Sequence, residues 1–96
     1  MLNITDIRIR LVKKDDSKLK AVASMTIDGC FVIHDIKVVE GNNGYFVPMP
    51  SRKTPDGEFK DIAHPIDTPT RQLIDSSVLA AYEKAVKEDS ENSEQN

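Results

Sequence analysis

The stretch GNNGYFVPMPSRKTPDG, residues 41–57, decides how the rest of the chain is arranged. The residues before it alternate as β-strands do, and the residues after it lead into one helix. Its glycines and prolines predict a loop of well-defined turns, because proline fixes φ and removes a backbone donor. Arg52 and Lys53 stand between Pro50 and Pro55 in this loop. Adjacent cations on a rigid loop predict contact with an anion, although a solvated basic turn fits the same residues.

Upstream of this loop, apolar and polar residues alternate with the period of β-strands. One shorter segment of the same kind lies within the stretch and another follows it. Pro48 places the first of these at the edge of a sheet or ends it. The predicted strands are residues 3–12, 19–27, 30–40, 45–49 and, more briefly, 58–63.

The Asp28-Gly29 pair is typical of a two-residue hairpin turn, in which both central residues have a positive φ. Such a turn sets the register of the two strands that it joins and pairs Ala23 with His34. We therefore expect Cys30 to be a small buried residue next to the turn. In the same register, His34 is a hydrogen-bonded histidine on the apolar face of the sheet.

Thr68 and Pro69 predict the start of the helix, because threonine is a good N-cap and proline suits the first helical position. An apolar stripe at helical spacing follows, and we expect the helix to end near Lys87. Residues 88–96 hold four acids and no base, without an apolar pattern, and predict a disordered acidic tail. The chain thus divides into a domain of residues 1–87 and a tail.

These elements predict an α+β fold, with an antiparallel sheet of four to five strands and one C-terminal helix. A chain of 96 residues buries only a modest core. Phe31, Ile33 and Val39 fall on the second face of the predicted sheet and are too apolar to be fully exposed to solvent. We therefore expect a homodimer that covers part of this face.

The charge distribution separates the two parts of the chain. Residues 1–87 contain 13 Lys and Arg against 12 Asp and Glu, which gives 13 − 12 = +1, and residues 88–96 contribute −4. The net charge of −3 therefore comes from the tail, and the domain itself is close to neutral. A nearly neutral domain with local basic groups is compatible with a polyanionic ligand.

The chain offers one cysteine, which forms no internal disulfide and fits a reducing compartment. No run approaches the ~20 apolar residues of a membrane span, and the first residues lack the pattern of a secretion signal. We expect a cytoplasmic protein that does not bind membranes.

Arg52 and Lys53 are the best candidates for a binding site, since arginine offers a fork for phosphate or guanine and lysine a point charge. Lys60 and Arg71 are among the other cations that could extend the patch. No nucleophile or phosphate-loop motif occurs, so we expect no enzyme activity, no cofactor and no small-molecule substrate. His34 and His64 could meet only through the fold, and they support a zinc site weakly.

Long motifs of this chain occur in the same order and spacing as in a known family. The chain resembles the bacterial stage V sporulation protein G (SpoVG) family of septation proteins over roughly residues 1–86. The acidic tail lies outside the resemblance, and Val47-Pro48 stands where the family more commonly has Val-Ala. The matching motifs are ITDIRIR at 4–10, FVIHDIKVVEGNNG at 31–44, FV at 46–47, MPSRKTPDGEF at 49–59 and DIAHPI at 61–66.

The resemblance implies a small dimeric regulator that binds DNA and RNA and is linked to sporulation, septation and gene control. In that family, a basic group just after Met-Pro-Ser contacts nucleic acid, and here this group is Arg52-Lys53. Ser51 and Thr54 flank it, so the expected nucleic-acid site consists of these four residues with Lys60 and Arg71.

Two further hypotheses stay open beside the nucleic-acid-binding regulator. One is a protein-interaction module of cell division with incidental nucleic-acid binding, which would use the edge strand at residues 45–49 and the apolar second face. The other, less supported, is a metal-dependent enzyme that uses His34 and His64.

Overall fold

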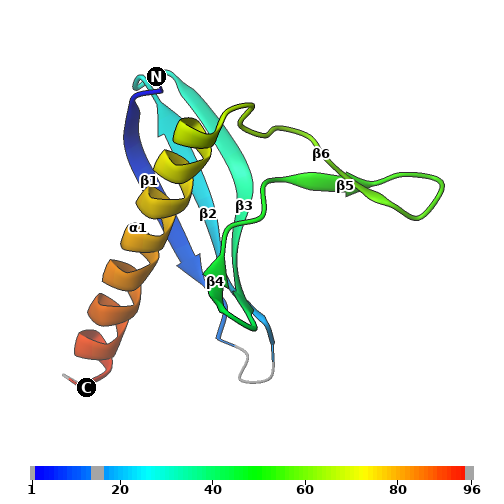
Figure 1. The fold of residues 1–96 in the computed structure, drawn as a ribbon. Helices are drawn as coiled ribbons and strands as arrows, with labels where there is room; N and C mark the ends of the chain where they lie inside the picture. The colour runs from blue at the N-terminus through cyan, green and yellow to red at the C-terminus, as the bar shows by residue number, and fades with distance from the viewer. Residues whose placement is uncertain (1, 14–16, 95–96) are drawn as a thin grey trace.

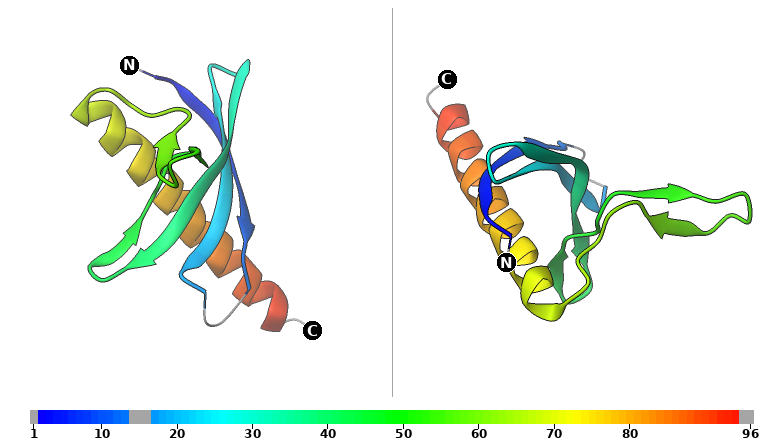
Figure 2. Two further views of the ribbon diagram at one scale, coloured as in Figure 1. Left: turned by 90° about the vertical axis from the view of Figure 1, so that its right-hand side faces the viewer. Right: turned by 90° about the horizontal axis from the view of Figure 1, so that it is seen from above.

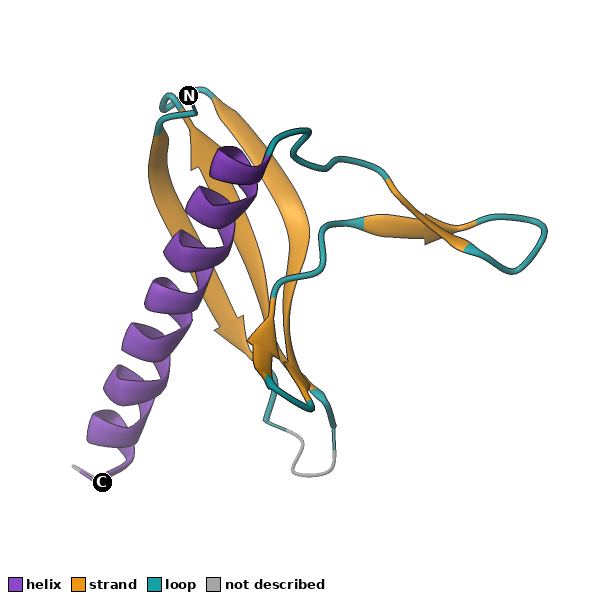
Figure 3. Ribbon diagram, viewed as in Figure 1, coloured by secondary structure: helices purple, strands orange, loops and turns teal. Residues whose placement is uncertain are grey.

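The computed structural model describes residues 2–13 and 17–94, and it shows a curved antiparallel sheet packed against one long helix (Figures 1 and 3). The four strands of the sheet stand in the order β1-β2-β3-β4, and a separate hairpin, β5–β6, projects from the body. The α+β fold is confirmed. The elements are β1 (Ile4–Leu11), β2 (Leu19–Ile27), β3 (Phe31–Gly41), β4 (Gly44–Phe46), β5 (Ser51–Lys53), β6 (Phe59–Asp61) and α1 (Thr68–Glu94).

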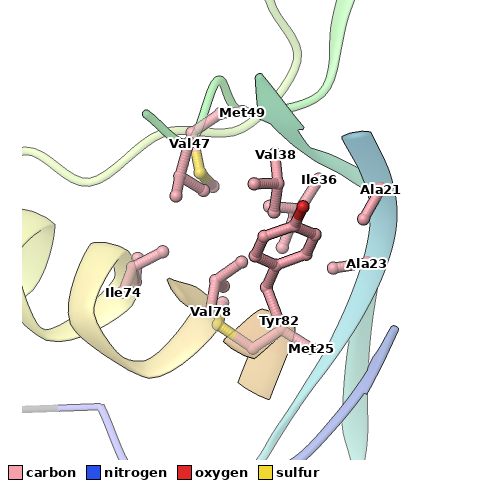
Figure 4. Close-up of a cluster of buried hydrophobic side chains, with 10 residues drawn as sticks. All are labelled: Ala21, Ala23, Met25, Ile36, Val38, Val47, Met49, Ile74, Val78 and Tyr82. Atoms are coloured by element: carbon pink, nitrogen blue, oxygen red, sulfur yellow. The ribbon is translucent and has the colours of Figure 1, made fainter. Parts of the chain in front are cut away.

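The core lies between α1 and the inner face of the sheet, which curves around one side of the helix (Figures 2 and 4). Alternate residues of β2 and β3 point inward, because successive side chains of a strand leave opposite faces. They meet residues one helical turn apart on α1. The buried side chains are Ala21, Ala23 and Met25 of β2, Ile36 and Val38 of β3, Val47 and Met49 after β4, and Ile74, Val78 and Tyr82 of α1.

The turn between β2 and β3 has the backbone predicted from Asp28-Gly29 but a different register. Asp28 and Gly29 have φ of 54° and 65°, and the amide of Cys30 donates to the carbonyl of Ile27 at 3.1 Å. Cys30, however, stays in the turn, and the first ladder pair is Ile27 with Phe31. The prediction of a buried Cys30 is therefore wrong: its side chain is exposed.

A β-bulge in β3 shifts the register a second time. Ser24 of β2 lies opposite two residues, His34 and Asp35, because Met25 pairs with Ile33 and Ala23 pairs with Ile36. Asp35 has a φ of 63°, a conformation that aspartate tolerates better than most residues.

The bulge overturns the prediction of a core histidine. It brings Ile36 and Val38 to the inner face and leaves His34 exposed on the outer face, with its ring Nδ1 3.0 Å from the hydroxyl of Ser24. A hydrogen bond was expected for His34, but not on the solvent side of the sheet.

The region around residues 41–57 contains more sheet than expected. The predicted strand at 45–49 is the three-residue β4, and the loop expected after it includes β5, which pairs with β6. Pro50 and Pro55 flank β5 without interrupting it, so no missing amide breaks the ladder. The predicted strand at 58–63 is the shorter β6.

Helix α1 begins one residue earlier and ends later than predicted. Asp67, not Thr68, is the N-cap, since its carboxylate Oδ1 accepts from the amide of Thr70 at 2.7 Å. The helix runs to Glu94, past the expected end at Lys87, and Lys13 Nζ lies 2.8 Å from Asp89 Oδ1.

The boundary of the folded domain at residue 87 stays a prediction, because a helix can extend beyond the core that it packs against. Residues 95 and 96 of the predicted tail lie outside the described residues. Within the described part of the chain, no helix combines the length and the apolar character that crossing a membrane requires.

Candidate nucleic-acid interface

The candidate site lies on a hairpin, called here the arm and made of residues 51–61, that stands away from the body of the protein (Figures 1 and 2). At its root the amide of Ile62 donates to the carbonyl of Pro50 at 2.7 Å. At its tip the amide of Thr54 donates to the carbonyl of Glu58 at 2.7 Å, and Gly57 adopts a φ of 87° that closes the turn. Hydrogen bonds at both ends therefore define the hairpin.

The register of the arm decides which side chains act together. Arg52 pairs with Lys60, and Lys53 pairs with Phe59. Directly paired residues share one face of a hairpin, whereas neighbours along a strand take opposite faces. Arg52 and Lys60 therefore form one face, the basic face of the arm, and Lys53 lies on the other face.

The basic face places two positive charges directly opposite each other. Like charges directly opposite each other in a sheet repel, so a bound anion would relieve the repulsion between Arg52 and Lys60. Both side chains are exposed, and none of the ion pairs among the described residues involves a cation of the arm. Of the acids of the arm, Asp56 and Glu58 lie at or next to the tip, and Asp61 pairs with Ser51 at the root, on the opposite face.

The structure separates the six residues that the sequence grouped together. Ser51 is half-buried at the root of the arm, and the hydroxyl of Thr54 donates to the carbonyl of Glu58 at 3.1 Å. Arg71 lies in the first turns of α1, outside the arm, and its charge partly offsets the effect of burial on the pKa of Asp75. The sequence-predicted residues that share a face of the arm are Arg52 with Lys60 and Ser51 with Lys53.

Phe59 is a residue of the arm that the sequence analysis did not single out. Its side chain is 72% exposed and lies on the face of Lys53. The available signal was an aromatic residue in a short strand with no apolar neighbour spaced to form a core face.

A second polar surface lies on the outer face of the sheet. A shallow hollow there is lined by side chains of β1, β2 and β3, but its cations are partly compensated. Arg8 Nε lies 3.2 Å from Asp6 Oδ2, and Lys20 Nζ on the same sheet lies 3.4 Å from Glu40 Oε2. The basic face of the arm is therefore the better candidate for a polyanion. The hollow is lined by Arg8, Ile9, Arg10, Val22, Ser24, His34 and Asp35.

The two histidines do not form a common site. His34 lies on the outer face of β3, and His64 lies in the loop before α1, where its ring Nδ1 is 3.1 Å from the carbonyl of Pro65. Across residues 2–13 and 17–94, no group of three or more His, Cys, Asp or Glu side chains is placed to hold a metal ion.

Comparison with known proteins finds the same family along nearly the whole chain. The family model described as SpoVG matches residues 2–84. The chain is 58% identical over 93 residues to "Putative septation protein SpoVG" of Clostridium acetobutylicum, covering 97% of both chains. It is 61% identical over 83 residues to the protein of that name in Clostridium perfringens (86% of this chain, 91% of the other). It is 54% identical over 93 residues to the protein of that name in Thermoanaerobacter sp. (97% of this chain, 100% of the other).

Proposed function

The chain belongs to the SpoVG family, and we propose that it is a homodimeric regulator that binds DNA or RNA and affects septation or sporulation. The observation that carries the proposal is the basic face of the arm. Arg52 and Lys60 stand side by side, exposed and without an acidic partner among the described residues, on an element that projects from the body. The proposal places the protein in the cytoplasm, where bacterial nucleic acid is found.

The chemistry expected at this face is contact with the phosphate backbone. Arginine and lysine bind phosphate oxygens through charge-assisted hydrogen bonds and release counterions from the nucleic acid. A projecting hairpin can enter a groove that a flat surface cannot reach. The protein thus acts as a binding protein without a reaction, a cofactor or a small-molecule substrate of its own.

A homodimer strengthens this binding, because two arms act on one nucleic-acid molecule. The second contact becomes intramolecular and raises the overall affinity without any new type of interaction. The dimer is supported by large apolar side chains that one chain leaves in solvent, among them Phe59, Ile62 and Ile66. Sedimentation equilibrium at micromolar concentration tests it, and a monomer throughout would refute the dimer.

A gel-shift titration against salt tests nucleic-acid binding. If phosphate contacts dominate, the logarithm of the association constant falls linearly with the logarithm of the salt concentration. Unrelated DNA and RNA fragments of equal length serve as paired ligands. Affinity that does not change with salt, or no binding at low salt, would contradict the proposal.

A protein-interaction module of cell division is the second candidate. β4 is an edge strand of the main sheet, and Tyr45 and Phe46 on it are 48% and 51% exposed. A peptide could extend the sheet along this edge. This candidate gains if Arg52→Ala with Lys60→Ala leaves the cellular function intact.

A further inference from the structure

The arm and the loop after it carry a run of exposed apolar side chains. Phe59 is 72% exposed, Ile62 67% and Ile66 90%. Single exposed apolar residues are ordinary, but three large ones within eight positions mark a surface that has a partner.

The arm also lacks the support that a hairpin of its size needs. β5 and β6 are three residues each and pair only with each other in the part of the chain that the structure describes. An isolated two-stranded hairpin is marginal in water and becomes stable when another element packs against it. The hydrogen bond between Ile62 and Pro50 defines a root from which the arm points away from its own body (Figure 2).

A groove of about 560 Å³ lies at the root of the arm, between the start of α1 and the ends of β2 and β3. Its lining is mostly apolar, and Asp67 stands in it as an acidic group. A groove of this kind accepts a large apolar side chain. The apolar residues that line it include Leu2, Ile27, Ile33, Ala63, Ile66 and Ile74.

We propose that the arm of one chain packs into this groove of a second copy, with Phe59 as the anchor, and that the exchange is reciprocal. The inference rests on the homodimer of the proposed function and says where its interface lies. One chain carries both the anchor and the groove, which is what a two-fold symmetric interface requires. The face of Phe59 also carries Lys53 and Asp61, whose charges offset each other, so the apolar contact of Phe59 carries the fit.

The exchange also orients the site for nucleic acid. Phe59 and Lys53 occupy one face of the arm, and Arg52 and Lys60 occupy the other. When the Phe59 face is covered by the second copy, the basic face points away from the interface. Dimerisation therefore presents both basic faces to solvent.

The experiment compares self-association of three full-length variants by sedimentation equilibrium. Phe59→Ser removes the anchor, Ile66→Ser removes an apolar side chain of the groove, and Val86→Ser is the control. Val86 is 41% exposed on α1, outside the residues that line the groove. We expect the dimer dissociation constant to rise at least tenfold for the first two variants and less than twofold for the control.

A photo-crosslink identifies the contact directly and does not depend on the folding of a variant. Benzoylphenylalanine at position 59, with a tagged and an untagged chain mixed, should give a crosslinked dimer. Its crosslinked peptide should contain residues of the groove, from 25–33 or 63–74.

The outcomes separate this inference from the proposed function. A wild-type monomer at every concentration overturns both the homodimer and the exchange. A wild-type dimer that Phe59→Ser leaves unchanged, with crosslinks elsewhere, overturns the exchange alone. A Phe59→Ser protein that dimerises normally but binds single-stranded oligonucleotides tenfold less tightly shows that Phe59 contacts bases, which also overturns the exchange.

Discussion

Arg52 lies directly opposite Lys60 across the two strands of the arm, so the two cations share one face although eight positions separate them in the sequence. Lys53, the neighbour of Arg52, lies on the other face with Phe59. Adjacency in the sequence therefore gives a misleading picture of the candidate binding group. Under the proposed function, Arg52 and Lys60 each contact a phosphate from the same face of the arm.

The first prediction compares two double variants. Arg52→Ala with Lys60→Ala should abolish most nucleic-acid binding and lower the salt slope by about 2 per chain, about 1 for each lost phosphate contact. Arg52→Ala with Lys53→Ala, which splits the charge loss between two faces, should lower it by about 1. Gel shifts at four salt concentrations measure both.

Folding must be unaffected for this comparison to be valid. All three cations are exposed, so we expect stability changes within about 0.5 kcal/mol, checked by circular dichroism and thermal melting. If the two double variants bind equally well, the basic face is not the unit of recognition. If both bind like wild type, the contact lies elsewhere, and the outer-face cations Arg8 and Arg10 are the next to change.

The second prediction concerns the acidic end of the chain. Deleting residues 88–96 should strengthen nucleic-acid binding at low salt, because it removes four negative charges per chain. High salt should erase the difference. Gel shifts of the full-length and truncated proteins at both salt concentrations measure it, and equal or weaker binding by the truncated protein at low salt would contradict the prediction.

The truncation should leave the fold intact, even though α1 extends to Glu94. The deleted segment contributes the ion pair between Asp89 and Lys13, whose side chains are 41% and 68% exposed. Exposed pairs of this kind contribute about 0–1 kcal/mol. A loss of cooperative melting would show that the segment belongs to the folded domain.

Much of the fold could be predicted from the sequence because alternation and helical spacing are local signals. Asp28-Gly29 located the hairpin turn correctly. The β-bulge at His34 and Asp35 could not be predicted, since it depends on whether Ile36 and Val38 fit against α1 better than their neighbours. That comparison involves residues about forty positions apart.

The candidate site could be predicted in part. Residue type and the motif after Met49-Pro50 indicated Arg52 and Lys53. The pairing of β5 with β6 was not predicted, because the prolines on either side of β5 indicated a loop. Without that pairing, neither the shared face of Arg52 and Lys60 nor the exposed position of Phe59 could be deduced. The N-cap was predicted one residue late, although aspartate at position 67 is itself a favoured cap.

The third prediction concerns this cap. Hydrogen bonds from Thr70 lower the pKa of Asp67. A lowered pKa contributes stability that is present above the unfolded-state pKa and is lost as the pH falls through the folded-state pKa. Asp67→Ala should therefore lower the melting temperature at pH 7 more than at pH 3. Asp67→Asn should keep most of the stability, because asparagine caps helices well, and lose the pH dependence. An equal effect of Asp67→Ala at both pH values would contradict this assignment.

The fourth prediction concerns Asp75, a half-buried residue of α1 next to Ile74 of the core. Its Oδ1 atom is buried without a hydrogen-bond partner among the described residues, and burial raises the pKa of this carboxyl, an effect that Arg71 partly offsets. A raised pKa contributes stability that is fully present below the unfolded-state pKa and is lost as the pH rises through the folded-state pKa. At neutral pH the charged carboxylate therefore destabilises the folded state, and Asp75→Asn should raise the melting temperature at pH 7. The gain should be modest, because a partly exposed carboxylate is screened by solvent, and it should shrink as the pH falls towards 4.

Glu83→Gln, which removes an exposed acid from the same helix, is the matched control and should change little. Melting curves from pH 4 to 8 measure the effect, and an Asp75→Asn protein that melts no higher than wild type at pH 7 would show that the buried Oδ1 atom has a partner in solution.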